Sequence, residues 1–417
     1  MRTVFFDATR LFVRGSRFSP TGIDRVVLAY ARWLLQRSDV DLMPVVTARG
    51  RLWAAPRALL AGIIDGTETF RVAAREAPIA SDSWTALTAA LAASPDTAVP
   101  ALRSRSVAHQ IPARILWHAR VLGRGIARLR PAHPTVGSIY LNVSHTGLGD
   151  PQVLPALAAK GVANVVMVHD LIPISHPEYC ASGAQARHLR RMRSILDSAA
   201  LVIANSRTTA DALMAYAETI GRPCPPIKVA LLGIEPDFAP RPEPLGAAWP
   251  YFVCVGTLEA RKNLSFLLTL WRRLAEELGA SAPRLVLVGR RGWENEAVID
   301  HLQRSEAVAR LVHEVSDLPD HHLARLISGA RALLAPSFAE GFDLPVVEAM
   351  SLGTPVIASD IPVHRELATS ATLIDPLDGP GWLGSIKAAA NLPRPVFQPP
   401  RWEDHFAALA DTVLGSG

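Results

Sequence analysis

Two glutamates eight positions apart, Glu340 and Glu348, have the spacing in this sequence that points most directly to chemistry. Glu340 precedes Gly341, and Glu348 lies in a segment predicted to form a helix with Pro345 in its first turn. The start of such a helix directs free N–H groups and the positive end of its dipole toward whatever precedes it. An anion site flanked by two carboxylates suits a ligand with phosphate in its middle and hydroxyls at both ends, and a nucleotide sugar has that layout.

The peptide groups between the two glutamates are expected to hold a diphosphate. Those groups belong to Gly341, Phe342, Asp343 and Leu344. Glu340 is then expected to hydrogen-bond sugar hydroxyls, and Glu348 the ribose diol. The alternative is that Glu340 caps a turn and Glu348 is an ordinary helix residue. The preceding strand, the glycine turn and the following Gly353-Thr354-Pro355 favour the ligand site.

This segment resembles the donor-site signature of the retaining glycosyltransferases of family 4, which is a pair of glutamates separated by seven residues. The resemblance implies the GT-B fold, an α/β architecture of two Rossmann-like, doubly wound parallel-sheet domains that face a central cleft. Asp343 departs from the family pattern, because many members have glycine at this position. We expect the Asp343 side chain to face away from the phosphates while its backbone N–H contributes to the site.

Arg261 and Lys262 follow a predicted strand from 251 to 255, in a segment similar to the family's phosphate-binding loop. The resemblance implies that both side chains meet the donor diphosphate, and a solvated surface pair is the alternative. Fixed cations stabilise the charge that builds on a departing phosphate, so no metal and no cofactor are expected. Gly289, after the next predicted strand, lies in a segment that resembles the nucleotide-base region, with a plain glycine turn as the alternative.

Gly22 stands in the predicted first domain, between its first strand and a helix. Many family members have a glycine turn here, and a residue without Cβ lets the backbone approach a donor phosphate closely. The alternative is an ordinary strand–helix turn. Arg25, the next basic residue, is a weaker candidate on the acceptor side and faces either the cleft or solvent.

His169 and Asp170 follow a strongly apolar predicted strand and resemble the His-Asp motif that many family members place between the domains. The resemblance implies that His169 bonds the transferring sugar or its phosphate, and that Asp170 orients His169 or faces the acceptor. The alternative for a lone histidine is a satisfied core or surface residue. His145, at the end of another predicted strand, is a weaker acceptor-side candidate.

Apolar strands alternate with helical patterns along both halves of the 417-residue chain, which predicts two βαβ domains. Prolines between 236 and 249 predict a linker. We therefore expect an acceptor-side domain over 1–243, with an irregular or helical elaboration over about 54–135. The nucleotide-sugar domain is expected over 244–395, with a C-terminal helix over 396–417 that crosses back to the first domain.

Composition is that of a globular chain, with 49% hydrophobic and 19% charged residues and a net charge of +5. Three scattered cysteines predict no disulfide framework and favour a reducing cytoplasm. The apolar runs are too short to span a bilayer. Residues 111–130 form a basic amphipathic pattern that suits either an anionic membrane surface or packing on the chain's own domain. Positive charge alone does not support nucleic-acid binding.

The resemblance, strongest to mannosyltransferase-like members, implies a retaining, metal-independent transfer of sugar from a nucleoside diphosphate to a glycan hydroxyl. The acceptor is expected to be a lipid-linked glycan of surface polysaccharide, reached in the cytoplasm or at the inner face of the membrane. GDP-mannose is the first candidate donor, and dTDP-rhamnose, GDP-fucose and UDP-hexoses stay open. An epimerase, a phosphorylase or a non-catalytic nucleotide-binding scaffold are the rivals. No Gly-x-Gly-x-x-Gly fingerprint supports a dehydrogenase.

Overall fold

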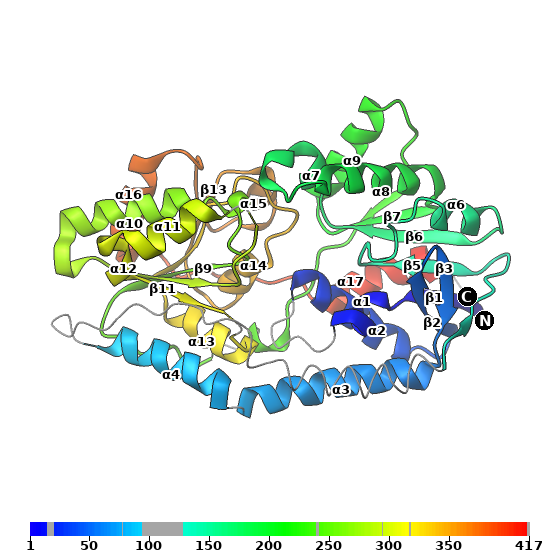
Figure 1. The fold of residues 1–417 in the computed structure, drawn as a ribbon, viewed down its shortest axis with the longest axis horizontal. Coiled ribbons are helices and arrows are strands. Elements are labelled where there is room, and N and C mark those ends of the chain that lie inside the picture. The colour runs from blue at the N-terminus through cyan, green and yellow to red at the C-terminus, as the bar shows by residue number, and fades with distance from the viewer. Residues whose placement is uncertain are drawn as a thin grey trace.

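The protein consists of two α/β halves that lie side by side (Figure 1), as seen in a computed structural model. Each half is built around one sheet with helices on both faces. The structure describes residues 1–14, 21–76, 78–93, 128–238, 242–293, 295–316 and 318–414.

The first half contains an eight-stranded sheet in the order β4-β3-β2-β1-β5-β6-β7-β8. Its strands are β1 (Arg2–Asp7), β2 (Val40–Ala48), β3 (Arg51–Ala54), β4 (Arg130–Pro131), β5 (Ile139–Asn142), β6 (Ala163–Val168), β7 (Leu201–Ala204) and β8 (Ile227–Val229). All pairings are parallel except those of β3 with β2 and with β4, which form an antiparallel edge. The helices include α1 (Thr9–Arg14), α2 (Gly22–Gln36), α6 (Val153–Ala158), α7 (Ile172–Ser175), α8 (Ala184–Ser198) and α9 (Arg207–Thr219).

The second half contains a six-stranded, wholly parallel sheet in the order β11-β10-β9-β12-β13-β14. Its strands are β9 (Tyr251–Val255), β10 (Arg284–Val288), β11 (Val312–Val315), β12 (Ala332–Ala335), β13 (Val356–Ser359) and β14 (Thr372–Ile374). The helices are α10 (Leu264–Leu278), α11 (Glu296–Arg304), α12 (Glu306–Leu311), α13 (Asp320–Gly329), α14 (Leu344–Ser351), α15 (Pro362–Leu367) and α16 (Gly379–Ala388). The strand order reverses between β9 and β12, and ligands of such sheets bind outside the strand ends at that point.

Continuous apolar strands explain why these sheets form, since both faces of each are covered by helices. Strands β5, β7, β12 and β13 are buried along their whole length. On α10 the buried residues recur every three or four positions, as at Leu264, Leu267 and Trp271, and this face packs on the second sheet. The predicted two-domain, doubly wound fold is confirmed.

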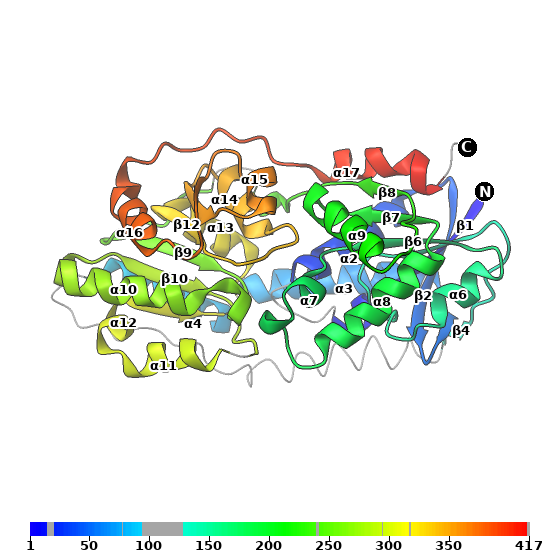
Figure 2. The same cartoon turned by 90° about the horizontal axis from the view of Figure 1, so that it is seen from above.

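The C-terminal segment leaves the second domain after α16 and returns to the first (Figure 2). Helix α17 (Trp402–Leu409) and the π-helical turn that follows it pack against α2. Trp33 and Phe406 stack with ring centroids 4.6 Å apart, and Tyr30 meets Phe406 edge to face at 5.1 Å. Leu409 is fully buried in the core of the first domain. The last helix is therefore part of the first domain's core.

The described part of the expected elaboration, over residues 57–92, is helical rather than irregular. These residues form two long helices, α3 (Arg57–Glu76) and α4 (Pro78–Ala92), which run along both domains (Figure 1). Helix α4 packs on the second domain, where Leu87 and Leu91 join its core. Trp249 donates to the carbonyl of Ala93 at 2.8 Å. Local sequence patterns do not indicate this packing, because Trp249, which bonds the residue after α4, lies more than 150 positions further along the chain.

Most of the basic pattern over 111–130 lies outside the described residues, so its membrane contact stays a prediction. Within the parts of the chain that the structure describes, no helix combines the length and the apolar character that crossing a bilayer requires.

We expect Leu409→Ala to destabilise the first domain by about 2–5 kcal/mol, because it leaves a cavity under α17. Val396→Ala is the matched control, since Val396 is 98% exposed in the crossing segment and should change stability by less than about 0.5 kcal/mol. Urea unfolding followed by circular dichroism measures both. Equal midpoints for Leu409→Ala and the wild type would show that α17 does not contribute to the first domain's stability.

Candidate active site

The site lies where the strand ends of the two sheets face each other, and two glycines let the domains touch there. A Cβ on Gly341, in the loop after β12, would lie 2.1 Å from the carbonyl oxygen of His169 at the end of β6. A Cβ on Gly22, at the start of α2, would lie 3.3 Å from Leu344 of the second domain. The structure thus brings together the predicted residues of both halves at one junction.

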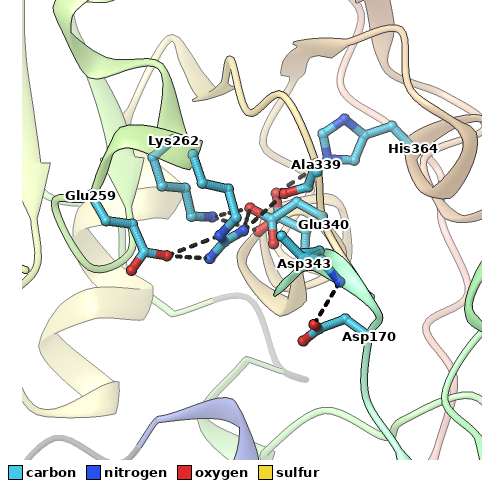
Figure 3. A network of polar contacts seen from close by, with 9 residues as sticks. Asp170, Glu259, Lys262, Ala339, Glu340, Asp343 and His364 are labelled. Carbon is cyan, nitrogen blue, oxygen red and sulfur yellow. Dashed lines mark hydrogen bonds and ion pairs between the residues drawn. The ribbon is translucent and has the colours of Figure 1, made fainter. Parts of the chain in front are cut away.

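A cluster of opposite charges fills the second-domain side of this junction (Figure 3). Glu340 pairs with Arg261 and, at 2.7 Å, with the Lys262 ammonium. Arg261 also pairs with Glu259 at 2.7 Å and donates to the carbonyl of Ala339 at 3.0 Å. Burial alone lowers the pKa of Lys262, but the neighbouring carboxylates outweigh it and raise that pKa. Both basic groups are therefore fixed cations.

The Lys262 side chain passes close to Gly256, the glycine that follows β9. Gly256 has a φ of 145°, and a Cβ on it would lie 2.8 Å from Cε of Lys262. A small pocket opens beside this contact, lined by Cys254, Gly256, Thr257, Leu258, Lys262 and Leu264. Gly289 packs on the same turn, since a Cβ there would lie 1.8 Å from the Gly256 carbonyl oxygen. The contact found for Gly289 is thus structural, and its role toward a nucleotide stays a prediction.

The expectation that the Asp343 side chain faces away from the cluster is wrong. Asp343 adopts a left-handed backbone with φ 60°, which costs roughly 1–2 kcal/mol for a residue with a Cβ. Its carboxylate is buried between Lys262, at 3.3 Å from Oδ1, and Nε2 of His364, at 3.1 Å from Oδ2. Although burial opposes ionisation, these cationic partners hold the pKa of Asp343 well below its usual range. No local sequence pattern indicates this contact, because His364 follows a different strand.

Glu348 is buried and bonded to the first domain. Its Oε1 pairs with Arg25 of α2, whose guanidinium also pairs with Asp320 at 2.7 Å and lies over the ring of Phe238. Burial raises the pKa of Glu348 to about 7. Arg25 opposes this rise, while Asp320 and Glu235 add to it. Arg25 thus links the domains, and its role toward an acceptor stays a prediction. Among the described residues, Oε2 of Glu348 has no hydrogen-bond partner.

His169 and Asp170 are placed by backbone contacts. Nε2 of His169 lies 2.8 Å from the carbonyl of Val143, and burial lowers the pKa of the imidazole. Asp170 accepts from the N–H of Ile172, the first residue of α7, at 3.0 Å. His145 is buried with a left-handed backbone, φ 59°, and its ring meets that of His169 edge to face at 5.4 Å. Their chemical roles stay predictions.

Direct bonds dock the loop after β12 on the first domain. Ser206 donates to the carbonyl of Gly341 at 2.8 Å, and as the N-cap of α9 it also accepts from the N–H of Thr209. Glu366 of α15 accepts from the N–H groups of Arg207 and Thr208 at 2.6 and 2.8 Å. A second-domain carboxylate thus lies at the positive end of α9, where negative charge is stabilised.

The side chains of Phe342 and Leu344 are buried in the core cluster of the first domain, so these residues offer a ligand only their backbone. Asp320, His364 and Glu366 are the residues that sequence reasoning missed. Each has a partner distant in the sequence and stands in no motif, so only a spatial contact identifies them.

A known family covers the part of the chain that holds the charge cluster. Residues 249–387 match the family described as "Glycosyl transferases group 1", and this range includes Lys262, Glu340 and Glu348. This domain belongs to the group 1 glycosyl transferases. The glycosyl transferase domain therefore supplies the complete Arg261–Lys262–Glu340 cluster, while the first domain supplies the surface that closes over it.

Curated relatives of this chain are named as mannosyltransferases. The O-antigen chain mannosyltransferase B of Escherichia coli is 30% identical over 224 residues, which cover 51% of this chain and 58% of that protein. The O-antigen chain mannosyltransferase RfbU of Salmonella typhimurium is 32% identical over 235 residues, covering 55% and 61%. The chain thus spans less than two thirds of the length of these relatives.

The whole fold is similar to that of solved structures. Sucrose-phosphate synthase from Thermosynechococcus elongatus has a TM-score of 0.57 at 15% identity, with 99% of this chain and 95% of that chain covered. At this identity the likeness shows the fold alone, and it extends the match of the glycosyl transferase domain to the GT-B arrangement of both domains.

We expect Gly341→Ala to separate the domains, because its Cβ would collide with a backbone oxygen that cannot move independently of β6. The separation should raise the radius of gyration in small-angle X-ray scattering. Gly384→Ala in α16 is the control, since a Cβ there meets nothing within 4 Å, and it should leave the radius unchanged. An unchanged radius for Gly341→Ala would mean that the loop after β12 adapts without opening the junction.

Proposed function

We propose that this chain is a retaining, metal-independent glycosyltransferase that moves a sugar from a nucleoside diphosphate to a hydroxyl of a growing glycan. The observation that carries the proposal is the cluster of Arg261, Lys262 and Glu340 at the switch point of the second sheet, facing the first domain across Gly341. Positive charge fixed beside a carboxylate suits a ligand that presents phosphate next to sugar hydroxyls.

The diphosphate would take the place of the internal carboxylates around Lys262 and Arg261. Both cations are held by neighbours rather than by solvent, so they need little reorganisation to stabilise charge on the departing phosphate. Glu340 is then released toward the sugar hydroxyls. Oε2 of Glu348 is available to the ribose diol even while Oε1 keeps Arg25.

Transfer would proceed on one face of the sugar. The bond between the anomeric carbon and the diphosphate oxygen breaks, and the acceptor oxygen bonds to the same carbon from the same side. The acceptor proton passes to the departing phosphate oxygen, so no separate base is required. His169 lies at the domain junction beside Gly341, which suits contact with the transferring sugar. Closing both domains over the donor excludes water that would otherwise hydrolyse it.

Mannose from GDP-mannose is the first candidate, because the relatives aligned over more than half of this chain are named as mannosyltransferases. Their names also specify O-antigen chains, which supports a surface polysaccharide, lipid-linked during assembly at the inner face of the membrane, as the acceptor. dTDP-rhamnose, GDP-fucose and UDP-hexoses are the alternative donors, since one side chain in a sugar pocket decides such a choice.

A thermal-shift panel of GDP-, UDP- and dTDP-sugars tests the donor, because a ligand that binds the folded state raises the unfolding temperature. We expect a selective rise with GDP-mannose, and transfer of mannose to a glycan acceptor. Lys262→Ala and Glu340→Gln should each lower transfer by about 100-fold or more, as loss of transition-state stabilisation does.

Lys387→Ala is the matched control, since Lys387 forms a half-exposed ion pair with Glu277 on the outer helices and should leave transfer unchanged. Binding without transfer to any glycan would favour a nucleotide-binding scaffold instead. Full activity of Lys262→Ala and Glu340→Gln would overturn the catalytic proposal.

A further inference from the structure

His364 is a buried histidine whose two ring nitrogens both face acceptors. Its side chain is 1% exposed at the start of α15. Nδ1 lies 2.8 Å from the carbonyl oxygen of Ser359, and Nε2 lies 3.1 Å from Oδ2 of Asp343. A backbone carbonyl only accepts hydrogen bonds, so Nδ1 carries a hydrogen.

The state of Nε2 then depends on the Asp343 carboxylate. A neutral imidazole protonated at Nδ1 would turn a lone pair from Nε2 toward a carboxylate oxygen, and two acceptors would face each other. Asp343 does not supply the missing proton, because its Oδ1 lies 3.3 Å from the Lys262 ammonium, which favours the ionised carboxylate. Nε2 therefore also carries a hydrogen, and His364 is an imidazolium.

The charges around this imidazolium balance. His364 faces Asp343 directly and Glu340 further along the same loop, and Lys262 lies on the far side of the Asp343 carboxylate. Together with Arg261 and Glu259, the cluster contains three cations and three carboxylates. Loss of the His364 proton would leave one negative charge in excess at the place where an anionic ligand must bind.

Lys262 has two carboxylate partners, whereas Asp343 has two cationic partners. If Lys262 turns to a phosphate, Asp343 keeps His364 and stays paired. Without a positive His364, the same movement would leave the buried Asp343 carboxylate without a cationic partner, which is strongly unfavourable.

We propose that His364 is a positioning residue of the donor site, whose imidazolium retains Asp343 and so frees Lys262 for the diphosphate of a nucleotide sugar. The proposal rests on the function proposed above and adds to it the means by which an aspartate is tolerated inside a diphosphate site. His364 does not touch the donor and acts through Asp343.

The proposal makes donor binding depend on pH. Burial lowers the pKa of His364, but the contact with Asp343 outweighs it and raises that pKa above its ordinary value of 6.5. The imidazolium is present below the raised pKa and is lost as the pH rises through it. Donor affinity should therefore fall at a pH above that at which an ordinary histidine titrates.

The charge of His364 is measurable without any ligand. In 15N-detected NMR of the wild-type chain at pH 7, both His364 nitrogens should give signals of protonated imidazolium. His405 is the internal control: its Nδ1 bonds the Leu231 carbonyl and its Nε2 bonds the hydroxyl of Tyr30, so it should be neutral. A neutral tautomer of His364 at pH 7 would overturn the proposal.

The role toward the donor is measured by calorimetric titration with GDP, UDP and dTDP at several pH values. His364→Gln should weaken binding about tenfold at pH 7 and remove the pH-dependent loss relative to the wild type. Titration of the nucleotide's own phosphate affects both proteins equally, so it cancels in the ratio of the variant's affinity to the wild type's affinity at each pH. In an Asp343→Gly background, His364→Gln should weaken nucleotide binding by less than about threefold, because no Asp343 carboxylate remains for His364 to hold.

Arg365→Gln is the matched control, because it removes a positive charge from the adjacent, exposed residue that pairs with Asp360. It should leave binding unchanged. An equal loss from His364→Gln with and without Asp343 would show a merely structural role and overturn the proposal. If the wild type bound none of the three nucleotides, the donor site itself would be refuted, and with it the role of His364, whatever the NMR signals show.

Discussion

The close approach of the loop after β12 to the end of β6 is the constraint on which the rest of the site depends. A Cβ at Gly341 would lie 2.1 Å from a backbone oxygen of the first domain, so the contact exists only because this residue has none. Ser206 bonds the carbonyl of the same glycine, and Glu366 caps α9 beside it. The loop that holds Glu340 is thereby fixed against both domains at once.

Buried charge is the second organising feature, and it is balanced locally. An isolated buried ion is strongly unfavourable, whereas alternating cations and carboxylates offset most of that penalty. Arg261, Lys262 and His364 alternate with Glu259, Glu340 and Asp343 on one side of the junction. Arg25 does the same for Glu348 and Asp320 on the other. Such a cluster can exchange an internal carboxylate for an incoming anion without leaving a cation unpaired.

Secondary structure was predictable wherever burial repeats with a regular period. The predicted strand over 251–255 and the predicted alternation of strands with helices match the structure, because buried parallel strands and amphipathic helices leave continuous or periodic apolar patterns. The packing of α4 on the second domain was not predicted, because its contacts lie far along the chain. The predicted orientation of the Asp343 side chain was wrong, because its partners Lys262 and His364 follow two other strands. Local sequence patterns do not predict contacts between residues that lie far apart in the chain.

The sequence by itself determined the class of fold. It also identified Arg261, Lys262, Glu340 and Glu348 as candidate residues around an anion site that precedes a helix. Apolar periodicity and glycine turns are local properties, so they can be recognised from the sequence alone. Only the tertiary structure decided which charges neutralise which. It paired Glu348 with Arg25 and Asp343 with His364, because electrostatic partners are chosen by distance in space and by exclusion of water.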